Sequence, residues 1–504
     1  MMTTKIGELD VQYPDTTLTN LAFGSCHKNK AVTKSHQIIW PSITRIKPQT
    51  FLWLGDTIYS PSKKEPVALI ETLEVEYDDL LSNSTIGYKD FLHNASLTSL
   101  TSIHGTHDDH DYGANDYGKQ MPDKESRREL FLEFIRASND ELSSSISNDD
   151  NGEEKEDNNN NNEKQSSTRN NRIENIRDGL YSSIDYGTYP QKVKIILLDT
   201  RSGRDLHCPI PSLGAVRLPF RLGAPIACVT RWITAGLNLQ NIFDSCRNVK
   251  MLSDEQWTWL EQQLQNNEEG GDNDSDVAVY IIGSSVQVLT TNPAVESWGH
   301  YPNERLKLLR LLNGVQKRAA VVILSGDVHH AEILDSSAGL KMNSDWEEGD
   351  GRIIEVTSSG LTHSCIEPFY GRLCGPILES FPNHRDVSKN NYYTGRNWGS
   401  IQIEWGENAQ NDMNNKNESK MQINVHDVNG KQVLTTGLYP LSTFASHMTE
   451  EQLRNVVGIS DGHLIPYVKK ILIILFLIFM IYRRSRKALA RTSKKVFSDK
   501  KKMV

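Results

Sequence analysis

The sequence predicts an α/β fold, and two features of the chain support this prediction. Short apolar runs typical of buried strands, such as 50–54 and 193–198, alternate with segments that have the apolar periodicity of helices. These runs repeatedly lead into a residue that can bind a metal or an anion: Asp56, Asp199, Gln287 and Asp327. Because α/β proteins bind ligands at the carboxyl ends of strands, we expect these residues to gather along one edge of a sheet.

Length, charge and cysteine content narrow the class of protein. With 504 residues, the chain is long enough for one large domain with appendages. The formal net charge of -9 does not suggest a nucleic-acid partner. The six cysteines include no CxxC pair, so no zinc ribbon is predicted, and a chain of this size does not need disulfides to fold.

The first predicted strands both end near a possible metal ligand. Residues 18–23 form a strand-like run that leads to Cys26. A thiolate at a strand end can bind a transition metal, and the alternative is a packed, inert thiol. After a helical pattern at 36–46, the buried run 50–54 leads into Asp56, and Gly55 lets the backbone turn closely there.

The stretch His104 to Tyr117 is the most chemically suggestive part of the chain, and its centre is Asp109-His110-Asp111. We interpret Asp109 as a metal ligand and His110 as a group that faces a leaving group. Asp111 would orient the imidazole and raise its pKa. The alternative is a polar, histidine-rich surface loop.

Low-complexity sequence follows a helical segment at 127–136. Residues 138–172 are rich in Asn, Glu, Asp and Ser and bury too little apolar surface to fold by themselves. Because strand-like sequence resumes afterwards, we predict a disordered insertion within one domain.

The second half of the chain repeats the pattern of strand followed by polar residue. A helix is expected from Met251, where Ser253 and Gln256 can form a capping box. Four further predicted strands lead into polar residues: 193–198 before Asp199-Thr-Arg201, 277–282 before Gln287, 319–324 before Asp327-Val-His329, and 352–356 before Thr357 to His363. The last two predicted strands, 400–405 and 421–427, are expected to be antiparallel.

Together these motifs resemble one family. They are Phe23-Gly-Ser-Cys26, Gly55-Asp-Thr-Ile-Tyr59, His107-Asp-Asp-His-Asp-Tyr112, Leu198-Asp-Thr-Arg201, Met251 to Leu260, Gly326-Asp-Val-His329 and Thr357 to His363. Their order over roughly residues 18 to 365 resembles the PhoD-like (alkaline phosphatase D) branch of the calcineurin-like metallophosphatases. Asp109 stands where the wider superfamily has Asn, and Asp327 where it has His; both swaps keep a metal-binding oxygen and are similar to the PhoD-like variant.

The resemblance implies a fold and a reaction. The fold would be a four-layer α/β/β/α sandwich over residues 18–430, after an N-terminal extension at 1–17. The reaction would be hydrolysis of a phosphate mono- or diester by a metal-bound hydroxide at a dinuclear site.

The resemblance also implies roles for individual residues. Asp56 would bridge two metals. The first metal, expected to be iron, would also be bound by Cys26, Tyr59 and His329. The second metal, expected to be calcium or another divalent ion, would be bound by Asp109 and Asp327. His110, with Asp111, would protonate the leaving oxygen. Arg201 and Gln287 are candidates for facing the substrate, although Arg201 could equally pin a loop.

One segment departs from the family pattern. Residues 206–249 carry several arginines and three of the six cysteines. Three interpretations remain: a family-specific insertion, a flap near a membrane, or sequence absent from the mature protein.

The C-terminal region predicts a membrane anchor. After a linker at 431–463, residues 464–482 contain the unbroken apolar run 471–482, which has lysines before it and arginines after it. That run alone rises about 18 Å as a helix, against a hydrocarbon core of about 30 Å, so the longer segment is needed to span. The alternative is a buried core helix.

Two features of the sequence give opposite predictions of membrane topology. The N-terminus lacks the apolar region of a signal peptide, which slightly favours a cytosolic catalytic domain. The positive-inside rule would instead place the basic tail, 483–504, in the cytosol.

Two other classes of protein fit parts of the sequence. An HD-type phosphohydrolase could use the ligands of His107-Asp-Asp-His110, but that fold is all-helical and the strand pattern argues against it. A membrane-anchored binding protein with a decayed site is the non-enzymatic alternative, and an empty metal site would distinguish it.

Overall fold

The computed structural model describes residues 10–29, 36–59, 67–94, 99–149, 177–211, 223–237, 239–265, 277–342, 351–368, 371–380, 385, 391–406, 419–445 and 447–458. The chain divides into two units after Gly458, and every described residue lies in the first unit.

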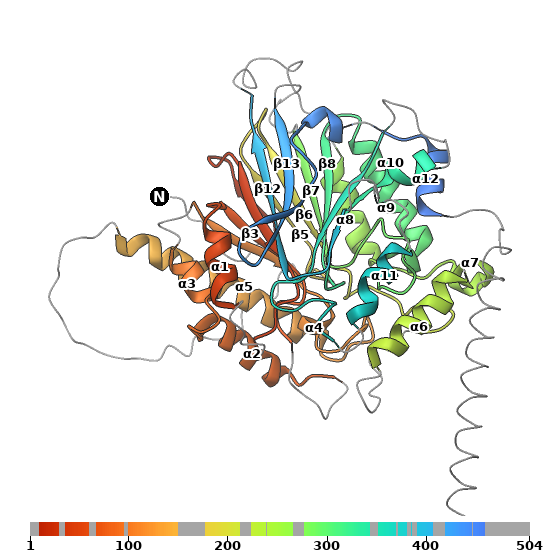
Figure 1. Ribbon diagram of the computed structural model, residues 1–504, viewed down its shortest axis with the longest axis horizontal. Coiled ribbons are helices and arrows are strands. Elements are labelled where there is room, and N and C mark those ends of the chain that lie inside the picture. Colours follow the sequence, from red (N-terminus) through yellow and green to blue (C-terminus); the bar gives the residue numbers. More distant parts are fainter. Residues whose placement is uncertain are drawn as a thin grey trace, which may run out of the picture. The chain divides into compact units, whose positions relative to one another are not determined.

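Two β-sheets form the centre of this unit (Figure 1). The eight-stranded sheet has the spatial order β1 (Val11–Tyr13), β5 (Ser182–Tyr186), β6 (Val193–Leu198), β7 (Val279–Ser284), β8 (Ala320–Ser325), β10 (Ile354–Ser358), β9 (Ala331–Asp335), β11 (Tyr392–Tyr393). The seven-stranded sheet has the order β14 (Gln432–Thr435), β13 (Lys420–Asp427), β12 (Asn397–Glu404), β2 (Asn20–Gly24), β3 (Thr50–Leu54), β4 (Ser102–Thr106), with β15 (Tyr439–Pro440) paired to β13. Strands β2, β3 and β4 are parallel, as are β6, β7, β8 and β10, so their carboxyl ends share an edge within each sheet.

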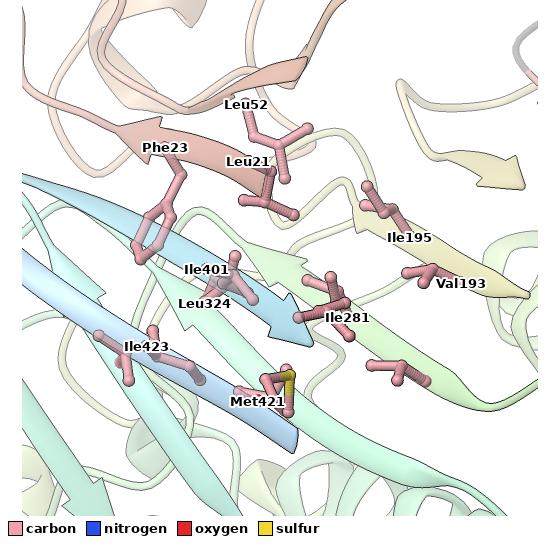
Figure 2. Close-up of a cluster of buried hydrophobic side chains, with 14 of the residues drawn as sticks. Leu21, Phe23, Leu52, Val193, Ile195, Ile281, Leu324, Ile401, Met421 and Ile423 are labelled. Carbon is pink, nitrogen blue, oxygen red and sulfur yellow. The ribbon is translucent and has the colours of Figure 1, made fainter. Parts of the chain in front are cut away.

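The main core lies between the two sheets (Figure 2). Leu21 and Leu52 from one sheet are buried in the same cluster as Ile195, Ile281 and Leu324 from the other. Alternate residues of each strand point to opposite faces, which explains why these strands appear as continuous apolar runs: both faces are buried.

Helices cover the outer faces of both sheets (Figure 1). The second apolar cluster joins the seven-stranded sheet to α1 (His36–Thr44), α2 (Ile70–Ser82), α3 (Tyr88–His93) and α5 (Lys124–Asp149). Helices α8 (Asp254–Leu264), α9 (Pro302–Val315), α10 (Ser336–Met342) and α12 (Glu450–Val457) belong to the side of the eight-stranded sheet. The prediction of an α/β fold, now seen to rest on two sheets, is confirmed.

Shorter helices lie in the connections between these elements. They are α4 (Asp109–Tyr112), α6 (Gly223–Gly236), α7 (Leu239–Ile242) and α11 (Cys374–Glu379), with 3-10 turns η3 (Asp244–Cys246), η5 (Trp298–His300), η6 (Gly371–Leu373) and η9 (Leu441–Phe444).

The predicted start of the disordered insertion, residue 138, is wrong. Helix α5 continues to Asp149, with Ser138 and Leu142 buried. The Ser138 hydroxyl accepts a 3.0 Å hydrogen bond from Tyr88. Asn139 also bonds both backbone groups of Ile103 at 2.9 Å, so a few specific contacts anchor this part of the helix, and composition alone does not reveal them. Residues 150–172 lie outside the described residues.

The predicted extension and linker are also partly folded. Strand β1 pairs in parallel with β5, so residues 11–13 belong to the sheet. In the predicted linker 431–463, β14 and β15 pair with β13, and α12 begins at a Thr449 capping box. The folded unit therefore ends near Gly458, not at 430.

The atypical segment 206–249 carries α6, α7 and η3, and its ends are joined by the disulfide Cys208–Cys246. A second disulfide joins Cys365 to Cys374. Among the described helices, none is both long and apolar enough to cross a bilayer. The predicted membrane segment 464–482 and the basic tail lie outside the described residues.

Candidate active site

The site forms where strands of both sheets end. Cys26, Asp56, Asp108 and Asp327 each stand two residues after the last residue of a strand, namely β2, β3, β4 and β8. The first three strands are adjacent and parallel in one sheet, and β8 belongs to the other. The shared offset brings one side chain from each strand to the same place.

The backbone is strained at three of these four positions and at His329, whereas Asp108 is extended. Cys26, Asp56, Asp327 and His329 have φ values of 62°, 52°, 70° and 59°, in the left-handed region that residues other than glycine rarely adopt. Each such conformation costs on the order of 1–3 kcal/mol and persists only where the surroundings impose it, typically at ligand sites. The strain therefore coincides with the predicted metal ligands.

The first donor group surrounds one oxygen of Asp56. Its Oδ2 accepts hydrogen bonds from the Tyr59 hydroxyl at 2.5 Å and from the Cys26 thiol at 3.5 Å. The Tyr59 oxygen also lies 3.1 Å from Nε2 of His329. Burial, and then the nearby charge of Asp56, raises the pKa values of Cys26 and Tyr59 well above their usual range. All four predicted ligands of the first metal thus lie together.

The second donor group is a cluster of carboxylates. Ligand atoms of Asp56, Asp108, Asp109 and Asp327 lie within 4.8 Å of one another. Burial, and then the neighbouring carboxylates, raises the pKa values of Asp56 and Asp327 well above their usual range. Oδ2 of Asp108 and Oδ1 of Asp109 are buried without a hydrogen-bond partner among the described residues. Orphaned carboxylate oxygens in a mutually repelling cluster fit a bound cation.

Asp108 was not predicted as a ligand, and Arg201 explains its environment. Nε of Arg201 donates to Oδ1 of Asp108 at 2.5 Å, and its Nη1 donates to Glu296 at 2.9 Å. The Arg201 side chain is 0% exposed. These contacts agree with the alternative that Arg201 pins a loop, and its role as a substrate ligand stays a prediction. The two-residue offset from β4 could have identified Asp108 from the sequence.

His110 lies beside the first donor group. Its ring centroid is 4.0 Å from that of Tyr59, and its backbone N–H donates to Oδ1 of Asp56 at 3.3 Å. The side chain is partly exposed. Burial lowers the pKa of His110, and the charge of Asp109 opposes this shift. A ring nitrogen of its imidazole lies within 4.8 Å of carboxylate oxygens of Asp56 and Asp109, so the side chain faces the same site.

The predicted role of Asp111 does not match its contacts. Its Oδ1 accepts from the backbone N–H groups of Thr57 and Ile58 at 2.9 and 3.3 Å and from the Tyr77 hydroxyl at 3.1 Å. Its Oδ2 accepts from the backbone N–H of Asp108 at 3.0 Å. Asp111 therefore holds the two loops that carry Asp56 and Asp108, instead of orienting the imidazole of His110. Adjacent helical residues point in different directions, which is the physical reason.

Two other strand-end residues also lie apart from the donor groups. Gln287 is fully buried and donates to Glu332 and Thr357, both at 2.9 Å, so the expectation that it faces the substrate is not supported by its contacts. Asp199 pairs with His107 at 3.1 Å and accepts from the backbone of its own loop. Both residues stabilise strand ends.

The segment after β10 supplies two residues that were not assigned roles from the sequence. The Ser359 hydroxyl lies 3.0 Å from the Cys26 sulfur and accepts from the backbone N–H of His329 at 2.8 Å. Nε2 of His363 lies 3.2 Å from Nε2 of His329. The motif Thr357 to His363 was the signal for this segment, but the motif does not say which members face the site.

Two sheets whose strand ends bring together thiol, imidazole, phenol and carboxylate groups define an α/β protein with a candidate metal site rather than an all-helical enzyme. The sequence matches the family model of the PhoD-like phosphatases over residues 21–411. The chain therefore belongs to the PhoD-like phosphatase family and is a phosphoric ester hydrolase.

Solved structures of other proteins are similar to this chain at low sequence identity. A structure described as "Structure of PhoD" is 16% identical, with a TM-score of 0.43, covering 88% of this chain and 77% of that one. A Plasmodium structure described as "GAP50 the anchor in the inner membrane complex of Plasmodium" is 9% identical, with a TM-score of 0.37, covering 88% of this chain and 96% of that one. No curated protein sequence matches this chain.

Proposed function

We propose that this protein hydrolyses phosphate mono- or diesters at a centre of two metal ions built around Asp56. One observation carries the proposal. Asp56 belongs both to the group with Cys26 and His329 and to the group with Asp108, Asp109 and Asp327. A carboxylate shared by two donor groups can bridge two cations, and cations about 3.5–4 Å apart are the usual arrangement for phosphoryl transfer to water.

The donor chemistry differs between the two groups and supports two different metals. Sulfur, phenol and imidazole donors around the first position favour a transition metal, for which iron is our proposal. The second position offers only carboxylate oxygens, which favour calcium or another hard divalent ion. Asp108 joins Asp109 and Asp327 as a proposed ligand of this second metal.

The reaction divides between the metals and the chain. When bound, the two cations supply Lewis acidity, which neutralises phosphate charge and acidifies a water molecule. Asp111 joins the loops of Asp56 and Asp108 through backbone hydrogen bonds, and this would keep the proposed ligands of the two cations at a fixed separation. His110 would donate the proton to the leaving oxygen. A bound phosphate ester brings negative charge, which favours the protonated imidazole.

Metal analysis with two matched variants tests this proposal. We expect wild-type protein to contain two metal ions per chain and to hydrolyse at least one of two substrates, a phosphomonoester and a phosphodiester. Asp56→Asn should lose metal and activity, because one charge fewer weakens both positions. Asp254→Asn is the control, since its side chain is 83% exposed. Full turnover by Asp56→Asn with two metals bound would contradict the site, and metal-free, inactive wild-type protein would support a decayed site.

The disulfides bear on localisation. Disulfides persist in oxidising compartments and are rare in the cytosol. The pairs Cys208–Cys246 and Cys365–Cys374 support a folded unit on the oxidising side of a membrane, contrary to the slight preference drawn from the N-terminus. We propose that residues 464–482 are the anchor and that the basic tail lies on the cytosolic side, which agrees with the positive-inside rule.

Extraction and protease protection test this topology. The full-length protein should resist extraction by carbonate and require detergent. In sealed vesicles with the cytosolic side outward, protease should remove only the tail. Digestion of the folded unit under these conditions, or extraction without detergent, would refute the proposal.

A further inference from the structure

We infer that helix α6 of the atypical segment 206–249 supports the second metal site, through a clamp in which Arg231 holds Asp116 and Asp116 orients Asp109. This inference rests on the proposed function, because it takes Asp109 to be a metal ligand. It also gives the atypical segment a role that its sequence left open.

The clamp begins at Asp109. The backbone N–H of Asp116 donates to Oδ2 of Asp109 at 2.8 Å. The other oxygen, Oδ1, is buried and has no hydrogen-bond partner among the described residues. Asp116 therefore fixes the rotation of this carboxylate and leaves Oδ1 available to a cation.

Asp116 needs outside support to do this. Its φ of 62° lies in the left-handed region, so its backbone does not hold this conformation without help. Arg204 donates from Nη2 to the carbonyl oxygen of Asp116 at 2.7 Å. Arg231 donates from Nη2 to the carboxylate of Asp116. One arginine thus holds the backbone and the other holds the side chain.

Arg231 lies in the atypical segment 206–249. It lies on α6, its side chain is 11% exposed, and its Nη1 donates to the carbonyl oxygen of Ala294 at 3.5 Å. The Thr234 hydroxyl of α6 donates to the carbonyl oxygen of Ile210 at 3.4 Å. The disulfide Cys208–Cys246 brings the two ends of the segment to a Cα–Cα distance of 5.3 Å. The disulfide and the helix together present Arg231 to the site.

A third metal is the competing interpretation of the same carboxylates. Ligand atoms of Asp109, Asp116 and Glu296 also lie within 4.8 Å of one another. However, Glu296 forms ion pairs with Arg201 and Arg204 and lies 3.9 Å from Arg231. Guanidinium groups already neutralise this cluster, so we assign it to support of the second metal and not to a third cation.

Cation titration of matched variants tests the clamp. Chelator-treated protein, reloaded with one equivalent of iron, is titrated calorimetrically with Ca²⁺ and, separately, with Mn²⁺. Arg231→Met should bind the second cation up to about 10-fold more weakly, the lower end of the cost of losing an outer partner of a metal ligand, because Arg231 acts on Asp109 only through Asp116. Arg231→Lys should recover part of the affinity. Arg247→Met is the control, because Arg247 lies in the same segment, is 58% exposed and forms its ion pair with the 89% exposed Asp244.

Three further variants keep the test decisive if Arg231→Met folds poorly. Asp116→Asn turns the ion pair with Arg231 into a neutral hydrogen bond and should also weaken the second cation. Adding Arg231→Met to it should cost less than Arg231→Met costs in wild type, because the pair is already weakened. Replacing Cys208 and Cys246 by serine should also weaken the second cation.

The outcomes separate this inference from the proposed function. If wild-type protein binds no second cation, the proposed function fails. If wild-type protein binds it and folded Arg231→Met binds it with equal affinity, the clamp alone is refuted. Independent, additive losses from Arg231→Met and Asp116→Asn would also refute it.

Discussion

Replacing Arg201 by methionine decides between the two roles suggested for this residue. Arg201 is fully buried between Asp108 and Glu296, with N–O distances of 2.5 and 2.9 Å. Methionine fills a similar volume without the charge. Glu296 keeps an ion pair with Arg204 after the substitution. Asp108 loses its guanidinium partner. Among the described residues, only the Ser285 hydroxyl, at 2.7 Å, still donates to Oδ1 of Asp108.

The size of the effect follows from this geometry. Removing one partner of a buried ion pair typically costs about 3–5 kcal/mol, because a charge stays buried without compensation. Since Glu296 stays paired, we expect the lower end, about 3 kcal/mol, in the free energy of unfolding. An exposed pair contributes about 0–1 kcal/mol. Arg310→Met is therefore the control, because Arg310 is 43% exposed and pairs with the 51% exposed Glu450.

Urea unfolding of chelator-treated protein measures the free energy without the metal that would otherwise compensate Asp108, and steady-state kinetics of the metal-loaded protein measure kcat and KM. Arg201→Met should lose stability and second-metal occupancy, whereas Arg310→Met should match wild type. If Arg201→Met is as stable as wild type and only its KM rises, Arg201 is a substrate ligand and the argument from burial is wrong.

Two further predictions concern histidines. His110→Ala should keep both metals and lose about 100- to 10,000-fold in activity on alkyl phosphate esters, but much less on an activated aryl ester, because a stable phenolate needs no proton. Loss of metal, or equal slowing of both esters, would contradict this role for His110. Burial lowers the pKa of His300 to about 4, so the unfolded chain takes up a proton near pH 6.5 before the folded chain does. Stability should therefore fall as pH drops from about 6.5 to about 4, by up to about 3 kcal/mol from this residue. His300→Gln can keep the donor to the Val295 carbonyl and should have a flatter stability profile in that range; an unchanged slope measured by urea unfolding at each pH would refute the assignment.

The strand-end pattern was readable from the sequence because it is local. A buried strand is a short apolar run, and the residue that follows it is fixed by the chain. Cys26, Asp56 and Asp327 could therefore be placed at strand ends, although Asp327 follows a strand of the other sheet and not the same edge, and Tyr59 and His329 followed from their motifs. The structure brings these five residues together.

The boundaries of folded segments were harder to predict from the sequence than the strand ends. Helix α5 continues through polar sequence because Leu142 is packed against the rest of the apolar cluster, and α12 packs on the folded unit although its sequence looks like a linker. A few buried side chains decide such boundaries, and composition averages them away.

Partners were decided only by tertiary structure. Asp108, Asp109 and Asp111 are close together in the sequence, but their side chains have different partners. Asp108 lies in the carboxylate cluster, whereas Asp111 accepts hydrogen bonds from the backbone of the Asp56 loop. The contact between Arg231 and Asp116 spans 115 residues along the chain. Sequence patterns determine where strands begin and end because hydrophobic periodicity is a property of neighbours. Which charged side chains form pairs depends on how segments that are distant in the sequence pack against each other, and this is determined only in the folded chain.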